Sequence, residues 1–157
     1  KSITFYDFIK LDDGTQGFVT DIGLRSTKIK SLDGDLIILP NGKLADSKIY
    51  NYHKPLPTTR VTVEFGVKFG SDIEKVKKIA LNEIKSLNLA LKDPEPKVIF
   101  DEIGDFSLKF KAFFWASSFE KKVEAKEAAT TAIYNALNKN KIGIPFPTRT
   151  VYLKNMK

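Results

Sequence analysis

Short runs of hydrophobic and polar residues alternate through the first third of the chain, and a helical spacing appears only beyond residue 70. The early runs end at Asp, Gly or Pro, which is typical of short β-strands joined by tight turns. Because such strands leave exposed edges unless a sheet closes on itself, we expect a small barrel or a strongly bent sheet. The five predicted strands are Asp7–Leu11, Gln16–Asp21, Leu24–Leu32, Asp35–Leu39 and Lys48–Tyr52.

Two of the connections between these strands have distinctive turn residues. Asp33-Gly34 lies between two strands, and a glycine that accepts positive φ suits a two-residue hairpin turn. Pro40-Asn41-Gly42 follows the next strand. Proline fixes φ and lacks an N–H, while Asn and Gly tolerate left-handed conformations, so we predict a sharp structural turn there.

The strand between these two turns is apolar on both faces. Its residues are Leu36, Ile37, Ile38 and Leu39. Such a strand is not expected to leave either face in water. A domain of about 55 residues can bury only one face of it in its own core, which favours contact with a neighbouring subunit.

The segment Lys54-Pro55-Leu56-Pro57 marks the predicted boundary between two domains, 1–56 and 57–157, because two prolines disfavour both helix and central strand. Beyond it the pattern follows the order β-α-β-β-α-β, which suits a ferredoxin-like fold with helices on one face of an antiparallel sheet. The predicted elements are strand Arg60–Phe69, a helix over 73–87, strands Lys97–Ile103 and Ser107–Trp115, a helix ending near 138–140, and an extended Ile144–Leu153.

The ends of these elements have their own signals. Ser71-x-x-Glu74 and Ser117-x-x-Glu120 predict capping boxes at the starts of the two helices. Pro145 and Pro147 confine regular strand pairing to the later part of the last segment.

The strand over 107–115 is unusually aromatic, with Phe110, Phe113, Phe114 and Trp115. Aromatic residues on both faces indicate burial on both sides or a contact between subunits. Interleaved Lys109 and Lys111 also permit a second interpretation, a base-stacking surface of an RNA-binding module. That interpretation is a fold analogy, because the strand lacks the glycine-rich aromatic signature of the common RNA-recognition module.

The composition describes an ordinary folded chain and excludes several kinds of site. Hydrophobic residues make up 42% and charged residues 29%. The chain has no Cys, which excludes disulfides and thiolate metal sites. His53 is the only histidine, so a catalytic triad or histidine metal site lacks components, and we interpret it as a solvated linker residue. We expect no cofactor, no metal and no catalysis.

The net charge of +7 is unevenly distributed along the chain. Residues 1–56 hold eight Lys or Arg against seven Asp, so most of the positive excess lies in residues 57–157. Positive charge of this size attracts nucleic acid or an anionic membrane, or concentrates anions in an enclosed space, although solubility alone also explains it. No apolar run approaches the roughly 20 residues of a membrane-spanning helix. Lysines on the faces of the two predicted helices include Lys75, Lys77, Lys78, Lys121 and Lys122.

The order of residues from Gly17 to Leu44, G-x-V-x-x-I-G-L-R-S-T-x-I-x-x-x-D-G-x-x-I-x-x-P-N-G-x-L, resembles the cytoplasmic β domain of the small-conductance mechanosensitive channel (MscS-like) family. The resemblance continues through Ile49-x-Asn51-Tyr52, Asp93-Pro94-x-Pro96-x-Val98 and Gly143-Ile144-x-Phe146-Pro147. The turn and motif residues that carry it are Gly17, Gly23, Asp33, Gly34, Pro40, Asn41, Gly42 and Asn51.

The resemblance implies an Sm-like β-barrel over 1–56, a ferredoxin-like domain over 57–157, and membrane helices that precede Lys1. It implies a homo-oligomeric ring, usually a heptamer, whose cytoplasmic parts enclose a vestibule below the pore of an osmoregulatory channel. Such a channel releases ions and small solutes on hypo-osmotic shock. Because the chain begins with Lys1 and not with Met, we interpret it as a fragment or processed form of a cell-membrane protein.

Within such a ring we expect the apolar strand Leu36–Leu39 to contact the neighbouring subunit and the five lysines to line the vestibule, where they would favour anions. The final strands would gather about the symmetry axis as a narrow barrel. Two interpretations outside this family stay open: a nucleic-acid-binding module, and an assembly scaffold with no transport role.

Overall fold

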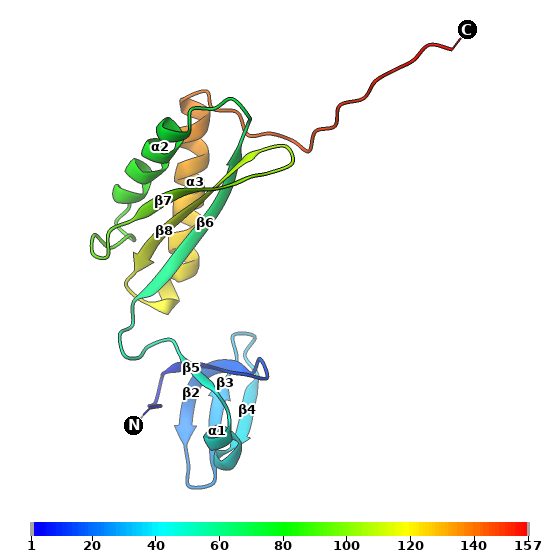
Figure 1. The fold of residues 1–157 in the computed structure, drawn as a ribbon. Coiled ribbons are helices and arrows are strands. Elements are labelled where there is room, and N and C mark those ends of the chain that lie inside the picture. Colours follow the sequence, from blue (N-terminus) through cyan, green and yellow to red (C-terminus); the bar gives the residue numbers. More distant parts are fainter. Residues whose placement is uncertain (1, 157) are drawn as a thin grey trace. The chain divides into compact units, whose positions relative to one another are not determined.

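The computed structural model describes residues 2–156. The chain divides into two compact units, residues 1–59 (unit 1) and residues 60–157 (unit 2). Each unit is built on its own β-sheet, as the ribbon in Figure 1 shows. The fold class is therefore mixed β and α with two separate sheets.

Unit 1 is a five-stranded antiparallel sheet in the order β4-β3-β2-β1-β5. Its elements are β1 (Phe8–Leu11), β2 (Gln16–Ile22), β3 (Ser26–Lys30), β4 (Leu36–Pro40), α1 (Asn41–Asp46) and β5 (Ile49–Asn51). All five predicted strands are present, with slightly narrower or shifted bounds. Every second residue points to the same face, so one face of the sheet builds the core. That core consists of Ile9, Leu11, Val19, Ile29, Leu39 and Leu44.

The two predicted turns of unit 1 are both different in the structure. The Ser31 amide donates to the Asp35 carbonyl at 2.8 Å, so the hairpin loop has three residues and not two, with Gly34 at φ +94°. Asn41 and Gly42 do not form a sharp turn, because helix α1 begins there directly after Pro40. The helix forms because it places Leu44 in the core, where that side chain is 7% exposed.

Asp7 connects the N-terminal segment of unit 1 with the segment that follows β5. Its Oδ2 accepts from the Thr4 amide at 2.8 Å and from Asn51 Nδ2 at 2.9 Å, and it lies 3.1 Å from Lys54 Nζ. Burial by itself raises the pKa of the Asp7 carboxyl. The hydrogen bonds from Asn51, Thr4 and Lys54 together outweigh burial, so the pKa lies below its ordinary value.

His53 belongs to the same region and is not the solvated linker residue that the sequence suggested. Its side chain is half-buried, and Nδ1 accepts a hydrogen bond from the Phe8 amide at 3.1 Å. Its own amide donates to Asn51 Oδ1 at 3.0 Å. Bonds to residues 45 positions away cannot be inferred from local pattern, which is why the sequence interpretation was wrong.

Unit 2 is a three-stranded sheet in the order β6-β8-β7 with two helices on one side of it (Figure 1). Its elements are β6 (Thr59–Val67), α2 (Ile73–Lys85), β7 (Lys97–Ile103), β8 (Leu108–Ala116), the 3₁₀ turn η1 (Phe119–Lys121) and α3 (Lys122–Lys139). The core between sheet and helices includes Val61, Val63, Val76, Ala80, Ile84, Phe110, Phe114, Ala125, Ala129 and Ile133. Small alanines on α3 allow the helix to pack close to its neighbours.

The helix starts in unit 2 differ from the predicted capping boxes. The N-cap of α2 is Asp72, whose side chain accepts from the Lys75 amide at 3.1 Å, while the Ser71 hydroxyl donates to the Lys68 carbonyl. Asp72 is therefore the residue that satisfies a free amide of the first turn. Helix α3 follows the 3₁₀ turn, and the residue before it, Lys121, provides no side-chain cap, so Ser117-x-x-Glu120 is not a capping box.

The predicted final strand of unit 2 does not form. Residues 144–156 carry no helix or strand, and the red segment in Figure 1 is extended and unpaired. The β-α-β-β-α part of the predicted order is present, and the final β is wrong for this structure. Pro145 and Pro147 lack the N–H groups that pairing would need.

We predict that Gly17→Ala destabilises unit 1 by about 3 kcal/mol. A Cβ at position 17 would overlap the carbonyl oxygen of Lys30 and the side chain of Ile29 on the adjacent strand. Gly42→Ala is the matched control, because nothing lies within 4 Å of a Cβ there and alanine favours the helix. Urea unfolding followed on the NMR signals of unit 1 measures both, and equal stabilities for the two variants would contradict the close approach.

We predict that Asp7→Asn destabilises unit 1 at pH 7 by about 1–3 kcal/mol. Because the folded pKa of Asp7 is lowered, its contribution is present above the ordinary value of 3.8 and is lost as the pH falls through the folded pKa. The difference in unfolding free energy between wild type and variant should therefore shrink between pH 5 and pH 2. The exposed Asp12→Asn is the control. A difference that stays constant over this range would show that the Asp7 charge is not involved.

Candidate functional site

The most distinctive surface of unit 1 is its β4 edge. Leu39 is 5% exposed and faces the core, whereas Leu36 and Ile38 are 59% and 58% exposed on the outward face. The strand pairs only with β3, so its second backbone edge has no strand neighbour within residues 2–156. An apolar strand with an open backbone edge invites pairing with another chain.

The other end of the same sheet is also open. Strand β5 pairs with β1 through Ile9 and Asn51, Lys10 and Tyr50, and Leu11 and Ile49. Its outer edge has no strand neighbour among the described residues, and the Tyr50 side chain is 47% exposed. Unit 1 thus presents two different open edges, one at each side of a single sheet.

Several motif residues from distant parts of the sequence meet beside the β4 edge. Asn41 Nδ2 donates to the Gly23 carbonyl at 2.9 Å, and the Thr27 hydroxyl donates to Asn41 Oδ1 at 2.8 Å. The Asn41 amide also donates to the Arg25 carbonyl at 2.9 Å. Asn41 therefore fastens the start of α1 to the β2–β3 connection, a role that sequence analysis missed because it saw only a local turn.

The remaining motif residues have separate positions. Gly17 is buried where β2 passes close to β3, and Asn51 Nδ2 donates to both the Ser2 carbonyl and Asp7 at 2.9 Å. Asp33 is exposed in the hairpin loop next to Gly34. These motif residues shape the sheet and its ends, and the structure brings together only some of them.

A second polar contact fixes α1 against the β1–β2 turn. Lys43 Nζ lies 2.7 Å from Asp13 Oδ2, and the Thr15 amide donates to Asp13 Oδ1 at 2.9 Å. The hydrogen bonds from Lys43 and then from Thr15 hold the pKa of the exposed Asp13 carboxyl well below its usual range. This contact holds one side of the α1 connection between β4 and β5.

The five candidate lysines lie in two separate groups. Lys75, Lys77 and Lys78 are in the first half of α2, whereas Lys121 ends η1 and Lys122 begins α3. The Lys68 amide, just before α2, donates to the Gly143 carbonyl just after α3. The start of α2 therefore adjoins the end of α3, and the two lysine groups lie at opposite ends of the helical layer. Lys77 Nζ is 3.7 Å from Glu74, so part of its charge is balanced.

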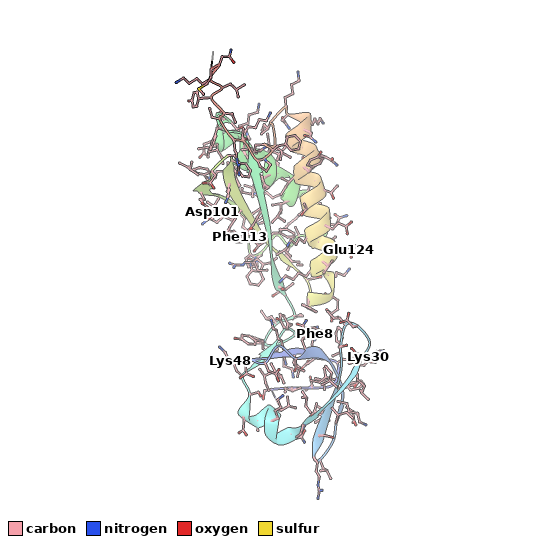
Figure 2. All side chains as sticks on the ribbon, turned by 90° about the vertical axis from the view of Figure 1, so that its right-hand side faces the viewer. Phe8, Lys30, Lys48, Asp101, Phe113 and Glu124 are labelled. Atoms are coloured by element: carbon pink, nitrogen blue, oxygen red, sulfur yellow. The ribbon has the colours of Figure 1, made fainter. Side chains whose placement is uncertain are left out.

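The face of the unit 2 sheet away from the helices carries paired charges. Figure 2 shows Asp101 and Phe113 on this face and Glu124 on α3 at the opposite side. Lys111 Nζ lies 3.6 Å from Glu64 and 3.5 Å from Asp101, which places one lysine of β8 between carboxylates of both neighbouring strands. A pocket of about 470 Å³ opens beside them. The charged side chains that line this pocket are already in ion pairs with one another.

The aromatic strand β8 is divided between the two faces. Phe110 and Phe114 are buried under the helices, whereas Phe113 and Trp115 are half-buried on the other face. The Arg60 guanidinium lies 4.9 Å from the centre of the Phe113 ring. Lys109 is 3.5 Å from Glu102. A base-stacking surface needs free rings and unpaired lysines, and these contacts do not favour one.

Among residues 2–156, no group of three or more His, Asp or Glu side chains is placed to hold a metal ion. In the same part of the chain, no helix is both long enough and apolar enough to cross a bilayer.

Comparison with known proteins places these features in a family. Residues 1–54 match the model described as "Mechanosensitive ion channel, beta-domain", and residues 61–144 match "Mechanosensitive ion channel MscS, C-terminal". An MscS family protein of Archaeoglobus fulgidus is 36% identical over 155 residues, which are 99% of this chain and 54% of that protein. The large-conductance mechanosensitive channel MscMJLR of Methanocaldococcus jannaschii is 32% identical over 90% of this chain and 41% of its own length.

A solved structure agrees with the sequence relatives. The closed-state crystal structure of Helicobacter pylori MscS superimposes with a TM-score of 0.90 and 29% identity over 98% of this chain and 60% of that chain. The chain thus spans about half the length of the curated relatives it matches. Both units match models of the same channel family. The chain therefore belongs to the MscS family of mechanosensitive ion channels.

Proposed function

We propose that this chain is the vestibule-forming part of a mechanosensitive channel, assembled as a homo-oligomeric ring, with no catalytic role. The observation that carries the proposal is the pair of different open edges on unit 1. The β4 edge carries exposed Leu36 and Ile38, and the β5 edge carries exposed Tyr50. When the β4 edge of one copy pairs with the β5 edge of the next, the contact is head-to-tail, and a head-to-tail contact that closes gives a ring.

The strand order of unit 1 supports an Sm-like assignment within this proposal. In the order β4-β3-β2-β1-β5 the fourth and fifth strands are the edges, so joining copies edge to edge would extend one sheet around the ring. The outward face of β4 would then be covered by the neighbour, as its apolar residues require. We assign the ferredoxin-like class to unit 2, a domain boundary at 54–57, and a ring of seven copies.

The parent protein would be embedded in the cell membrane by helices that precede this chain, with both units on the cytoplasmic side. The curated relatives are roughly twice as long as the matched region, which leaves room for such helices. Opened by hypo-osmotic shock, the channel would release ions and small solutes through the enclosed vestibule. Residues beyond 143 would gather about the ring axis as a narrow barrel.

The two lysine groups would set the charge of the vestibule. Lys75 and Lys78 are exposed near the start of α2, and Lys121 is exposed at the end of η1. Because the groups lie at opposite ends of the helical layer, they would act on permeating ions at two levels of the vestibule. An enclosed space lined by one sign of charge concentrates ions of the other sign.

We predict that Ile38→Lys abolishes ring assembly of the full-length channel while leaving unit 1 folded. Ile38 is 58% exposed, so the change removes little core packing, but it places a charge inside the proposed contact. Val123→Lys, at another exposed apolar position (78% exposed), is the matched control. Native mass spectrometry of the detergent-solubilised channels measures the number of copies, and intact rings in the Ile38→Lys variant would contradict the proposed edge contact.

We predict that charge reversal of each lysine group shifts ion selectivity towards cations. One variant carries Lys75→Glu, Lys77→Glu and Lys78→Glu, and the other carries Lys121→Glu and Lys122→Glu. Lys139→Glu, at the opposite end of α3 from Lys122, is the control for the Lys121/Lys122 variant only, because the end of α3 adjoins the start of α2. Reversal potentials of single channels in a salt gradient measure the effect. Unchanged reversal potentials in both variants would remove the lysines from the permeation path.

A further inference from the structure

The chain returns from α3 to the free edge of β6. Lys141 takes a left-handed conformation with φ +56° and ends the helix, and the Ile142 amide donates back to the Leu137 carbonyl at 2.9 Å. The Lys68 amide then donates to the Gly143 carbonyl at 2.8 Å, directly after the last residue of β6. In the order β6-β8-β7, β6 is an edge strand with room for one more neighbour.

This hydrogen bond determines how the following segment would pair if it continued along β6. Position 143 lies at the end of β6, so a continuation along that edge would run back towards its start and would be antiparallel. In an antiparallel ladder the directly opposed, hydrogen-bonded pairs recur at every second residue. With 68 opposite 143, the next hydrogen-bonded pairs would be Gly66 with Pro145 and Glu64 with Pro147.

Both positions that should donate to β6 are prolines. Each hydrogen-bonded pair needs an N–H from both residues, and Pro145 and Pro147 have none. The carbonyls of Gly66 and Glu64 would therefore lose their donors in the first two pairs of the ladder. We propose that Pro145 and Pro147 keep the segment after residue 143 (the C-terminal tail) off the β6 edge, so that the fourth strand of the unit 2 sheet cannot form.

The rest of the tail is well suited to a strand, which is why it requires such a block. Thr148, Thr150, Val151 and Tyr152 include the β-branched and aromatic types that strands favour. Yet Val151 and Tyr152 are 71% and 91% exposed in the structure. The spacing of the prolines, and not the composition of the tail, separates it from its own sheet.

The block leaves the tail available for contacts outside its own unit. That use of the tail, in a barrel made of tails from several copies, rests on the proposed function. The block itself does not, because it depends only on backbone groups of β6 and the tail. Hydrogen exchange along β6 therefore tests the proline block, whereas counting the copies in the ring tests the proposed function.

The test compares the chain with unchanged prolines and the double variant Pro145→Thr/Pro147→Thr. Both also carry Ile38→Lys, so that assembly does not affect the comparison. The readouts are amide hydrogen exchange of Thr62, Glu64 and Gly66 by NMR, and tryptic cleavage after Arg149. In the double variant we expect exchange at these amides to slow at least about tenfold, and cleavage to slow with it, because the tail pairs with β6.

A triple variant, Pro145→Thr/Phe146→Pro/Pro147→Thr, tests the spacing. Its proline lies at a position whose N–H would point away from β6, which an edge strand tolerates. We expect the same protection as in the double variant. Unchanged exchange in the double variant would overturn the proposal, and so would protection in the double variant that the triple variant lacks. If the chain never forms rings, the exchange comparison keeps its meaning, and only the proposed use of the tail is lost.

Discussion

Strand edges without partners are the constraint on which this structure depends. Backbone N–H and C=O groups along an edge form good hydrogen bonds only with another strand, with water or with a covering element. Unit 1 has such edges at β4 and β5, and unit 2 has them at β6 and β7. The β4 edge adds two exposed aliphatic side chains, Leu36 and Ile38, whose burial would stabilise any contact that also pairs the backbone. The proposed ring would use the first pair of edges, and the proposed action of the tail prolines would leave β6 unoccupied.

The interior of unit 1 holds these edges in fixed positions. Gly17 allows β2 and β3 to approach closely, and Asn41 fastens the start of α1 to the β2–β3 connection. Asp7 joins the segments before β1 and after β5 through Thr4, Asn51 and Lys54. A ring contact requires that one edge of each copy match the other edge of the next, so groups that fix the edges also fix the geometry of assembly. Gly17, Asn41 and Asn51 of the motif thus lie at contacts between strands or at the ends of the sheet.

Hydrophobic periodicity was enough to predict strands β1 to β8 and both long helices, but it also predicted a final strand over 144–153 that does not form. It predicted β7 with its observed bounds and the end of α3, because burial of one face imposes the same period on sequence and structure. The resemblance in residue order was enough to predict the family, which the family models and relatives confirm.

The details that sequence could not provide depend on distant partners or on single backbone hydrogen bonds. The predicted hairpin loop at Asp33-Gly34 had two residues and the observed loop has three. The backbone hydrogen bond from Ser31 to Asp35 makes this difference, and the sequence does not indicate it. Helix α1 begins directly after Pro40 because the helical conformation places Leu44 in the core of unit 1. That core is formed by distant strands, so the local sequence 40–42 does not indicate it. The cap of α2 shifted by one residue from Ser71 to Asp72, since both residue types cap helices well. Both lysine groups lie near the start of a helix in the sequence. Because α2 and α3 run in opposite directions, the two groups lie at opposite ends of the helical layer.

The edge-to-edge ring is tested most directly by disulfide trapping in a full-length channel from which any cysteine outside these 157 residues has been removed, since the 157 residues contain none. Two full-length single-cysteine channels, one with Ile38→Cys and one with Tyr50→Cys or Lys48→Cys, are expressed separately and together, then oxidised. The account predicts covalent dimers when the two are expressed together and none when either is expressed alone, because a head-to-tail contact joins β4 of one copy to β5 of the next. Dimers from the Ile38→Cys channel alone would indicate a symmetric β4–β4 contact, and no dimers in any mixture would contradict the ring that this structure suggests.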